Sequence, residues 1–292
     1  MQINKINNLL ELFYQQYQIQ NKESIFLQSL KEPRKEYSWE DVYLNINKLS
    51  EEISKHIKKG DRCLLVSENR PEWMIADLSI MLSGGVTVPA YTTYTERDYE
   101  YIIDDCTPAI IIISDKIQYK KIKDIIPKKH FIKKIIFFEN IENINEELNL
   151  KICDIFKKDK CNTKNFSDLK IQRKDMACII YTSGTQGNPK GVMLSHGGIL
   201  NNCEGAYELL KTFISKKPKF LTWLPLSHSY EHTVQFVQIV VGARVFYAES
   251  IDKLIKNMSV CSPEIMTAVP RFYQNLYQKI NGSFSKATGL KK

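Results

Sequence analysis

The apolar residues of this chain recur with two periods, one typical of helices and one of buried strands. The helical period is clearest in Val42, Ile46, Leu49, Ile53 and Ile57. Ser38, followed by Asp41 three residues later, provides the signal that begins such a helix, because the two side chains can cap its free backbone N–H groups. Gly60 ends the helix, and residues 63–66 predict a buried strand.

The same alternation continues along most of the chain. Pro71 begins a second predicted helix, which stops at Gly84 and Gly85. Further strands are expected at residues 86–88, 109–113, 131–138, 176–181, 219–224, 244–247 and 264–268, and further helices at residues 96–105, 229–241, 251–258 and 271–280. Residues 139–170 are polar and weakly periodic, which is typical of a long loop. The pattern predicts an α/β fold with mainly parallel sheets covered by helices.

Composition and charge narrow the class of protein. The chain has 292 residues, of which 43% are hydrophobic and 25% charged, as in ordinary globular proteins. Its formal net charge of +8 favours anionic ligands and says nothing about the fold. The densest basic stretch, residues 116–134, alternates lysine with isoleucine and contains no arginine. We therefore interpret it as a solvated surface and expect no nucleic-acid partner.

Cysteine usage and hydropathy bear on the compartment. The seven cysteines include no C-x-x-C pair, which favours reduced thiols in a cytoplasmic protein. The first residues are too polar for a secretory signal, and apolar runs such as 109–113 are too short to cross a bilayer. We expect a cytoplasmic protein and leave open a peripheral contact with a membrane.

The strongest chemical signal is the segment 181–191, Tyr-Thr-Ser-Gly-Thr-Gln-Gly-Asn-Pro-Lys-Gly, which follows an apolar strand. Its glycines allow backbone N–H groups to approach phosphate oxygens closely. Thr182, Ser183 and Thr185 offer hydroxyl donors, and Lys190 offers a positive charge. Hydrogen bonds to charged groups contribute roughly 1.5–3 kcal/mol each, so several together could hold a triphosphate.

Two alternatives exist for this segment. It is not a Walker A loop, because the residue five positions after Gly184 is Pro189 rather than the glycine that must precede the lysine. It could also be a flexible turn between strands, although the density of donors favours a phosphate site.

The segment resembles the phosphate-binding signature of the adenylate-forming superfamily, which includes acyl-CoA synthetases, luciferases and peptide-synthetase adenylation domains. Gln186 stands where the usual signature has threonine, and it retains the capacity for hydrogen bonds. Residues 69–73 with 85–91 resemble the early region where the family's first core motif lies. Residues 224–231 and 268–280 resemble the corresponding segments of long-chain acyl-CoA synthetases. The resemblance covers most of the chain from Ser38 onward.

The resemblance implies a fold and a domain organisation. Residues 1–165 would form the N-terminal α/β subdomain of the AMP-binding domain, and residues 166–292 a second α/β portion that carries the phosphate loop and is incomplete at its C-terminal end. The family's Tyr-Gly-x-Thr-Glu motif, its ribose-binding aspartate and its small C-terminal domain with the adenylating lysine are not found. We therefore expect an N-terminal fragment that is inactive by itself.

The resemblance also implies an activity. The parent enzyme would be a long-chain fatty acid–CoA ligase that uses ATP, Mg²⁺ and CoA and forms an acyl-adenylate, with the metal ligand outside this chain. The residues that would bind the ATP phosphates are Thr182, Ser183, Gly184, Thr185, Gln186, Gly187 and Lys190. His228 would lie near the reacting carboxylate, and Tyr230 and Phe236 would border an acyl channel, although core packing predicts the same apolar positions. Arg271 would pair with a phosphate or carboxylate, or cap a sheet.

Two other functions remain open. His228, Glu231 and His232 match the H-x-x-E-H motif of inverted zinc proteases, which would make the protein a zinc hydrolase. Against it, Pro225 lies just upstream, so His228 can be in a first helical turn at best. The second alternative is a non-catalytic protein that binds a nucleotide or a lipid. Oligomeric state and acyl chain length cannot be predicted from these patterns.

Overall fold

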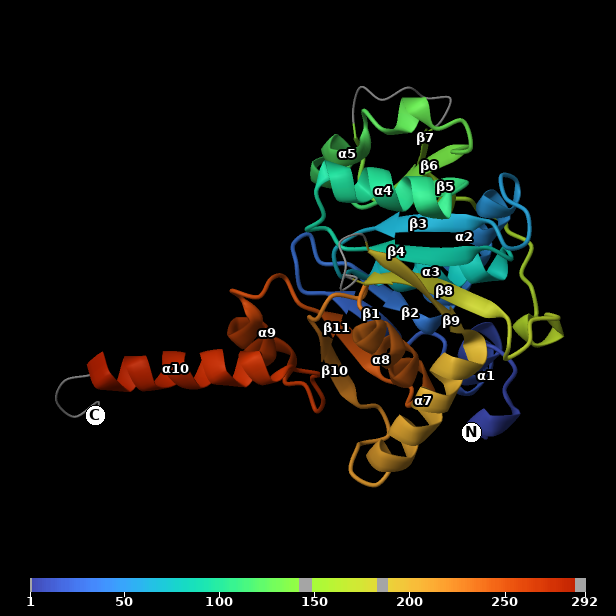
Figure 1. The fold of residues 1–292 in the computed structure, drawn as a ribbon. Coiled ribbons are helices and arrows are strands. Elements are labelled where there is room, and N and C mark those ends of the chain that lie inside the picture. The colour runs from blue at the N-terminus through green and yellow to red at the C-terminus, as the bar shows by residue number, and fades with distance from the viewer. Residues whose placement is uncertain (1, 142–148, 183–188, 287–292) are drawn as a thin grey trace.

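Two sheets organise the molecule (Figure 1). The structure is a computed structural model that describes residues 2–141, 149–182 and 189–286. The larger sheet contains, in spatial order, β7 (Asn149–Lys151), β6 (Lys134–Phe137), β5 (Ile110–Ile113), β3 (Arg62–Val66), β4 (Val86–Ala90), β8 (Met176–Thr182) and β9 (Lys190–Ser195). The smaller contains β10 (Lys219–Thr222), β11 (Arg244–Tyr247), β1 (Ile25–Ser29) and β2 (Glu36–Ser38). Only the β8–β9 and β1–β2 pairs of these sheets are antiparallel, which confirms the prediction of mainly parallel sheets.

Helices separate and cover the sheets. They are α1 (Leu9–Ile19), α2 (Trp39–Ser54), α3 (Pro71–Leu82), α4 (Glu96–Cys106), α5 (Lys116–Ile122), α6 (Ile152–Phe156), α7 (His196–Leu210), α8 (Ser229–Val240), α9 (Leu254–Cys261) and α10 (Pro270–Lys286). Short 3-10 helices lie at Ile3–Lys5, Ile126–Lys128 and Phe166–Asp168. In Figure 1, α10 projects away from the body of the molecule.

Side-chain alternation along β3 explains how both faces of the larger sheet are covered. Leu64 and Val66 face a core shared with α4 and α5, whereas Cys63 and Leu65 face the central core with α1, α2, α3 and α8. A third core packs α9 against the outer face of the smaller sheet. The molecule therefore has five layers: α4 and α5, the larger sheet, the central helices, the smaller sheet, and α9. Strands buried on both faces need an apolar partner on each side, which explains this alternation.

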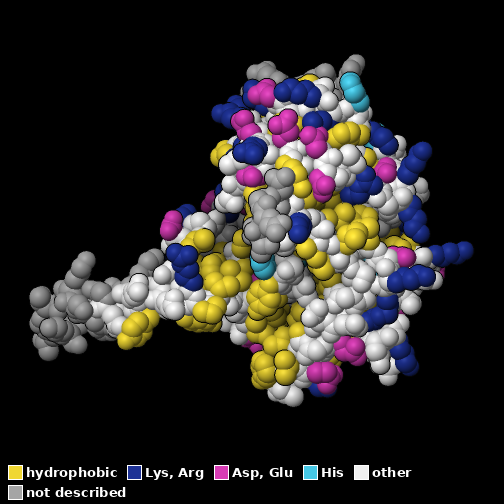
Figure 2. Space-filling model, in the orientation of Figure 1, with side chains coloured by type: hydrophobic (Ala, Val, Ile, Leu, Met, Phe, Trp, Pro, Cys, Tyr) yellow, Lys and Arg dark blue, Asp and Glu magenta, His cyan; other side chains and the backbone are white. Residues whose placement is uncertain are grey.

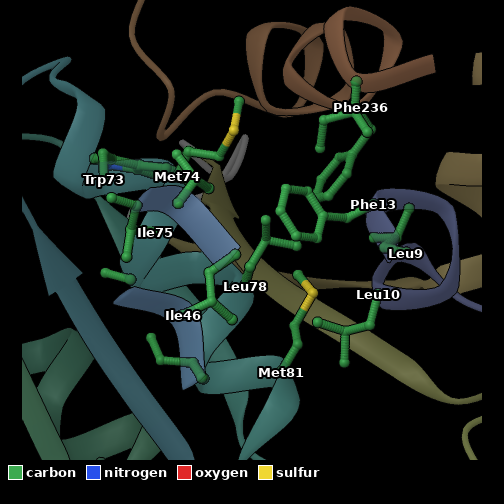
Figure 3. Close-up of a cluster of buried hydrophobic side chains, with 14 of the residues drawn as sticks. Leu9, Leu10, Phe13, Ile46, Trp73, Met74, Ile75, Leu78, Met81 and Phe236 are labelled. Atoms are coloured by element: carbon green, nitrogen blue, oxygen red, sulfur yellow. The ribbon is translucent and has the colours of Figure 1, made fainter. Parts of the chain in front are cut away.

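The central core holds α8 against the N-terminal helices (Figure 3). Phe13 of α1, Leu78 of α3 and Phe236 of α8 point toward one another in this view, and all three are fully buried. Close-packed interiors transmit small displacements, so the start of α8 is fixed by helices that begin more than 150 residues earlier.

The two predicted helix starts are confirmed in atomic detail. The Ser38 N–H donates to Oδ2 of Asp41 at 2.9 Å, and the Asp41 N–H donates to Oγ of Ser38 at 3.0 Å, which completes the capping box of α2. Pro71 occupies the first turn of α3. Gly84 follows α3 with φ +83°, a conformation that residues with a Cβ rarely adopt.

Each sheet combines strands from before and after residue 165, the predicted boundary between the two subdomains. β1 and β2 precede it but pair with β11 in the smaller sheet, while β8 and β9 follow it and complete the larger sheet. The sequence patterns also did not predict α1, β1, β2, β9 and α7. Residues 139–170, predicted as a loop, contain the short elements β7 and α6 in their described part. The expected strand at 264–268 is reduced to an isolated bridge between Ile265 and Phe220.

Candidate active site

The β8–β9 hairpin presents the two described ends of the phosphate segment side by side. Thr182 ends β8 and Lys190 begins β9, and the two residues are direct partners in the antiparallel register. Both are exposed. Opposite residues in such a pair place their side chains on one face, so a hydroxyl donor and an ammonium group lie together at the mouth of the hairpin. Of the other predicted phosphate ligands, Ser183, Gly184, Thr185, Gln186 and Gly187 lie outside the described residues.

Packing behind the hairpin fixes the strand that leads into it. Tyr181 is buried, and its hydroxyl donates to Oδ2 of Asp105 on α4 at 2.5 Å. Burial and this carboxylate raise the pKa of Tyr181. A Cβ on Gly191 would lie 2.9 Å from Cγ2 of Ile179 and 3.3 Å from Cζ of Tyr181. The last glycine of the motif is therefore required for packing against β8.

His228 lies at the start of α8, where it is the N-cap residue. Its imidazole is exposed, and its Nδ1 accepts a hydrogen bond from the Tyr230 N–H at 3.2 Å. In the neutral ring this bond leaves the proton on Nε2, which can donate to an anion. The free N–H groups and dipole of the helix N-terminus also favour negative charge at this point.

A buried charge pair joins α8 to the neighbouring elements. Nε2 of His232 lies 2.8 Å from Oδ2 of Asp77 on α3, and its Nδ1 lies 3.5 Å from Sγ of Cys178 on β8. His232 and Asp77 are both fully buried. Burial alone would lower the pKa of His232, but the Asp77 carboxylate outweighs that effect and raises it. The pair joins α8 to α3, and the contact with Cys178 joins α8 to β8.

The geometry of this pair argues against the zinc alternative. Both ring nitrogens of His232 are already used inside the protein, while the His228 ring faces solvent. Glu231 is buried, and its Oε2 accepts the hydroxyl of Thr267 at 2.6 Å. The three side chains of the H-x-x-E-H motif thus point into different surroundings. Across the described ranges, no group of three His, Cys, Asp or Glu side chains is placed to hold a metal ion.

The remaining predicted substrate residues are dispersed. Tyr230 is half exposed in the first turn of α8, two residues after His228. Figure 2 shows hydrophobic side chains gathered over the region of α7 and α8. Phe236 is fully buried in the central core, where it serves packing, the alternative that its apolar character also predicted. Arg271 is exposed in the first turn of α10.

A cavity of about 830 Å³ lies where strands of both sheets end, and the sequence patterns did not predict it. Its wall includes Ser67 after β3, Tyr91 after β4, Trp223 after β10 and Ala248 after β11. Ligands of α/β folds commonly bind outside the carboxyl ends of strands, which was the available signal for finding it.

Comparison with known proteins decides the family. The model of the AMP-binding enzyme family matches residues 14–291. The chain belongs to this family. Long-chain-fatty-acid–CoA ligase 6 of Homo sapiens and long chain acyl-CoA synthetase 4 of Arabidopsis thaliana are each 29% identical to it, over 90% and 87% of this chain. Fatty acyl-CoA synthetase A of Dictyostelium discoideum is 27% identical over 81% of it. The chain spans 40%, 40% and 36% of the length of these relatives.

Solved structures share the fold of this chain. A red-emitting luciferase from Phrixothrix hirtus superposes with a TM-score of 0.77 at 17% identity, over 91% of this chain and 51% of its own. An anthranilate CoA ligase superposes with a TM-score of 0.76 at 17% identity, over 94% and 52%. These similarities confirm the predicted α/β fold with mainly parallel sheets covered by helices. No helix in the described part of the chain is long and apolar enough to cross a bilayer.

Proposed function

We propose that this chain is the N-terminal part of an AMP-forming long-chain fatty acid–CoA ligase. The observation that carries the proposal is the placement of two anion-attracting features on one structural unit. Thr182 and Lys190 lie together at the hairpin mouth, where β8 ends. His228 is the N-cap residue of α8, and the contact between Cys178 and His232 joins β8 to α8. The names of the most similar relatives support the acyl substrate class.

The proposed reaction has two steps. A fatty carboxylate oxygen attacks the α-phosphorus of ATP, a P–O bond forms, and the bond to pyrophosphate breaks. The CoA thiol then attacks the acyl carbonyl and releases AMP. Negative charge develops on phosphate oxygens in the first step, so fixed donors placed there stabilise the transition state.

The residues divide this work by position. The Lys190 ammonium and Thr182 hydroxyl would hold the leaving pyrophosphate, and Nε2–H of His228 would orient the carboxylate or the α-phosphate. Mg²⁺ would neutralise phosphate charge, and the described residues offer no cluster of acidic ligands for it. A peripheral contact with the membrane would suit a long acyl substrate.

The test is ATP–pyrophosphate exchange in the complete gene product. Incorporation of labelled pyrophosphate into ATP that depends on palmitate supports fatty-acid adenylation. Binding of ATP without exchange, for palmitate and for shorter acids alike, would favour the non-catalytic nucleotide-binding alternative.

A further inference from the structure

The segment that begins with Asn69-Arg-Pro-Glu-Trp73 is hydrogen-bonded to the backbone that leads to His228. Nδ2 of Asn69 donates to the Leu224 carbonyl at 2.6 Å, and its Oδ1 accepts from the Leu226 N–H at 3.0 Å. One amide thus binds the backbone on both sides of Pro225, as a neighbouring strand would. The His228 N–H donates to the Pro225 carbonyl at 3.0 Å, which closes a turn over residues 225–228. This turn connects the backbone bound by Asn69 to the residue that carries the imidazole.

A second set of contacts, from Asp77 to α8, lies one helical turn beyond His228. Oδ2 of Asp77 accepts from Nε2 of Gln235 at 3.1 Å and pairs with Nε2 of His232 at 2.8 Å. The His232 N–H donates to the His228 carbonyl at 2.9 Å, so the paired histidine closes the first turn of α8. Trp73 packs edge-on against the His232 ring, with centroids 5.4 Å apart. Asn69 and Asp77 both belong to the segment that leads into and forms α3, so His228 lies between two anchors on one rigid element.

We propose that Asn69 and Asp77 are positioning residues, which hold His228 at a fixed place relative to the β8–β9 hairpin. The inference rests on the proposed function and adds a role for a motif that lies far from the phosphate segment in sequence. His228 is exposed and has little packing of its own, so its position depends on the backbone before it and the helix after it. A displacement of about 1 Å in a reacting site can lower the rate about a hundredfold.

A mutant cycle separates positioning from general stability. Asn69→Ala is combined with His228→Ala in the complete gene product, and kcat and KM for ATP are measured by palmitate-dependent pyrophosphate exchange. If Asn69 acts through His228, Asn69→Ala lowers kcat about ten- to a hundredfold when His228 is present and less than about twofold when it is already alanine. KM for ATP changes little, because the hairpin is untouched. Asn69→Asp keeps the acceptor for Leu226 and restores part of the rate.

Ser79→Ala is the matched control. Ser79 lies on α3, the helix that follows Asn69, and is fully buried; its hydroxyl lies 2.6 Å from the Ile75 carbonyl and 3.2 Å from the Ile46 carbonyl. Its loss removes a buried hydrogen bond of α3 without touching residues 224–232, so kcat is expected within about twofold of wild type. An equal loss of kcat from Asn69→Ala in both His228 backgrounds, or from Ser79→Ala, would overturn the positioning role.

A measurement without turnover keeps this inference distinct from the proposed function. In protein labelled at the histidine rings, the NMR signals of His228 are expected to shift or broaden in Asn69→Ala and to stay unchanged in Ser79→Ala. Unchanged His228 signals in Asn69→Ala overturn the positioning role whatever the activity. A shifted signal in a protein that shows no palmitate-dependent exchange supports positioning and counts against the proposed function alone.

Discussion

Replacing Glu231 by glutamine is expected to stabilise the folded protein at pH 8. The Glu231 side chain is 1% exposed, its Oε2 accepts the Thr267 hydroxyl, and its Oε1 has no hydrogen-bond partner within the described ranges. Burial raises the pKa of Glu231 to about 7, although the Thr267 hydroxyl opposes this increase. Ionisation therefore costs more in the folded than in the unfolded chain, and glutamine removes that cost while keeping the shape.

The magnitude follows from linkage. The unfolded carboxyl has a pKa of 4.5 and the folded one about 7, so between these values the folded state binds more protons and stability falls as pH rises. A tenfold difference in acidity between the folded and unfolded carboxyl corresponds to about 1.4 kcal/mol in the free energy of unfolding. Ionisation of Glu231 therefore lowers the free energy of unfolding of the wild-type protein by about 3 kcal/mol at pH 8 and by under about 1 kcal/mol at pH 5. Above the folded pKa the loss is complete. Glu231→Gln should recover these amounts at each pH.

Urea unfolding followed by tryptophan fluorescence measures the difference. Trp223 is a suitable reporter, because its indole N–H donates to the carbonyl of Thr267, and the hydroxyl of Thr267 donates to the Glu231 carboxylate. Glu51→Gln, a change on the exposed face of α2, is the control and should alter stability by less than about 0.5 kcal/mol. Equal effects of Glu231→Gln at pH 5 and pH 8, or a less stable variant at pH 8, would refute the reasoning.

The remaining predictions concern the hairpin and the start of α8. Lys190→Ala should lower kcat/KM for pyrophosphate exchange about ten- to a hundredfold, because a charge-assisted contact contributes about 1.5–3 kcal/mol, and a change within twofold would remove Lys190 from the site. His228→Ala should slow acyl-adenylate formation, measured in a single turnover, and metal analysis of the purified protein should find no stoichiometric zinc. His232→Leu should destabilise the fold by about 3–5 kcal/mol, because it leaves the Asp77 carboxylate buried without its charged partner. A loss under about 1 kcal/mol in urea unfolding would contradict the charged pair.

Local signals account for what the sequence could predict of the fold. The capping residues Ser38 and Asp41 and the Pro71 start lie within a few positions of the helices they begin, so a single chain displays them. Strand β1 was missed because its place depends on distant partners, as in the pairing of Leu27 with Val245. Such pairing leaves no mark within a short window of sequence. It also explains why each sheet combines strands from before and after the polar stretch.

In the candidate site, too, residues that are close in sequence could be predicted and contacts between distant residues could not. Thr182 and Lys190 belong to one contiguous motif, so the sequence assigned both to the phosphate segment, but it did not predict β9 or the direct pairing of the two residues. The pair of Asp77 with His232 spans 155 residues, and neither residue type reveals its partner. His232 instead suggested a metal ligand through a five-residue match, which burial and hydrogen bonding contradict. Short motifs specify chemistry only when the fold turns their side chains toward the same place.

The most direct test of the account is palmitate-dependent ATP–pyrophosphate exchange by the complete gene product, compared with its Lys190→Ala and His228→Ala variants. The account predicts exchange in the wild-type protein that requires the fatty acid and falls at least about tenfold in each variant, while both variants remain folded. Exchange that proceeds equally well in all three proteins, or no exchange with any fatty acid, would contradict it.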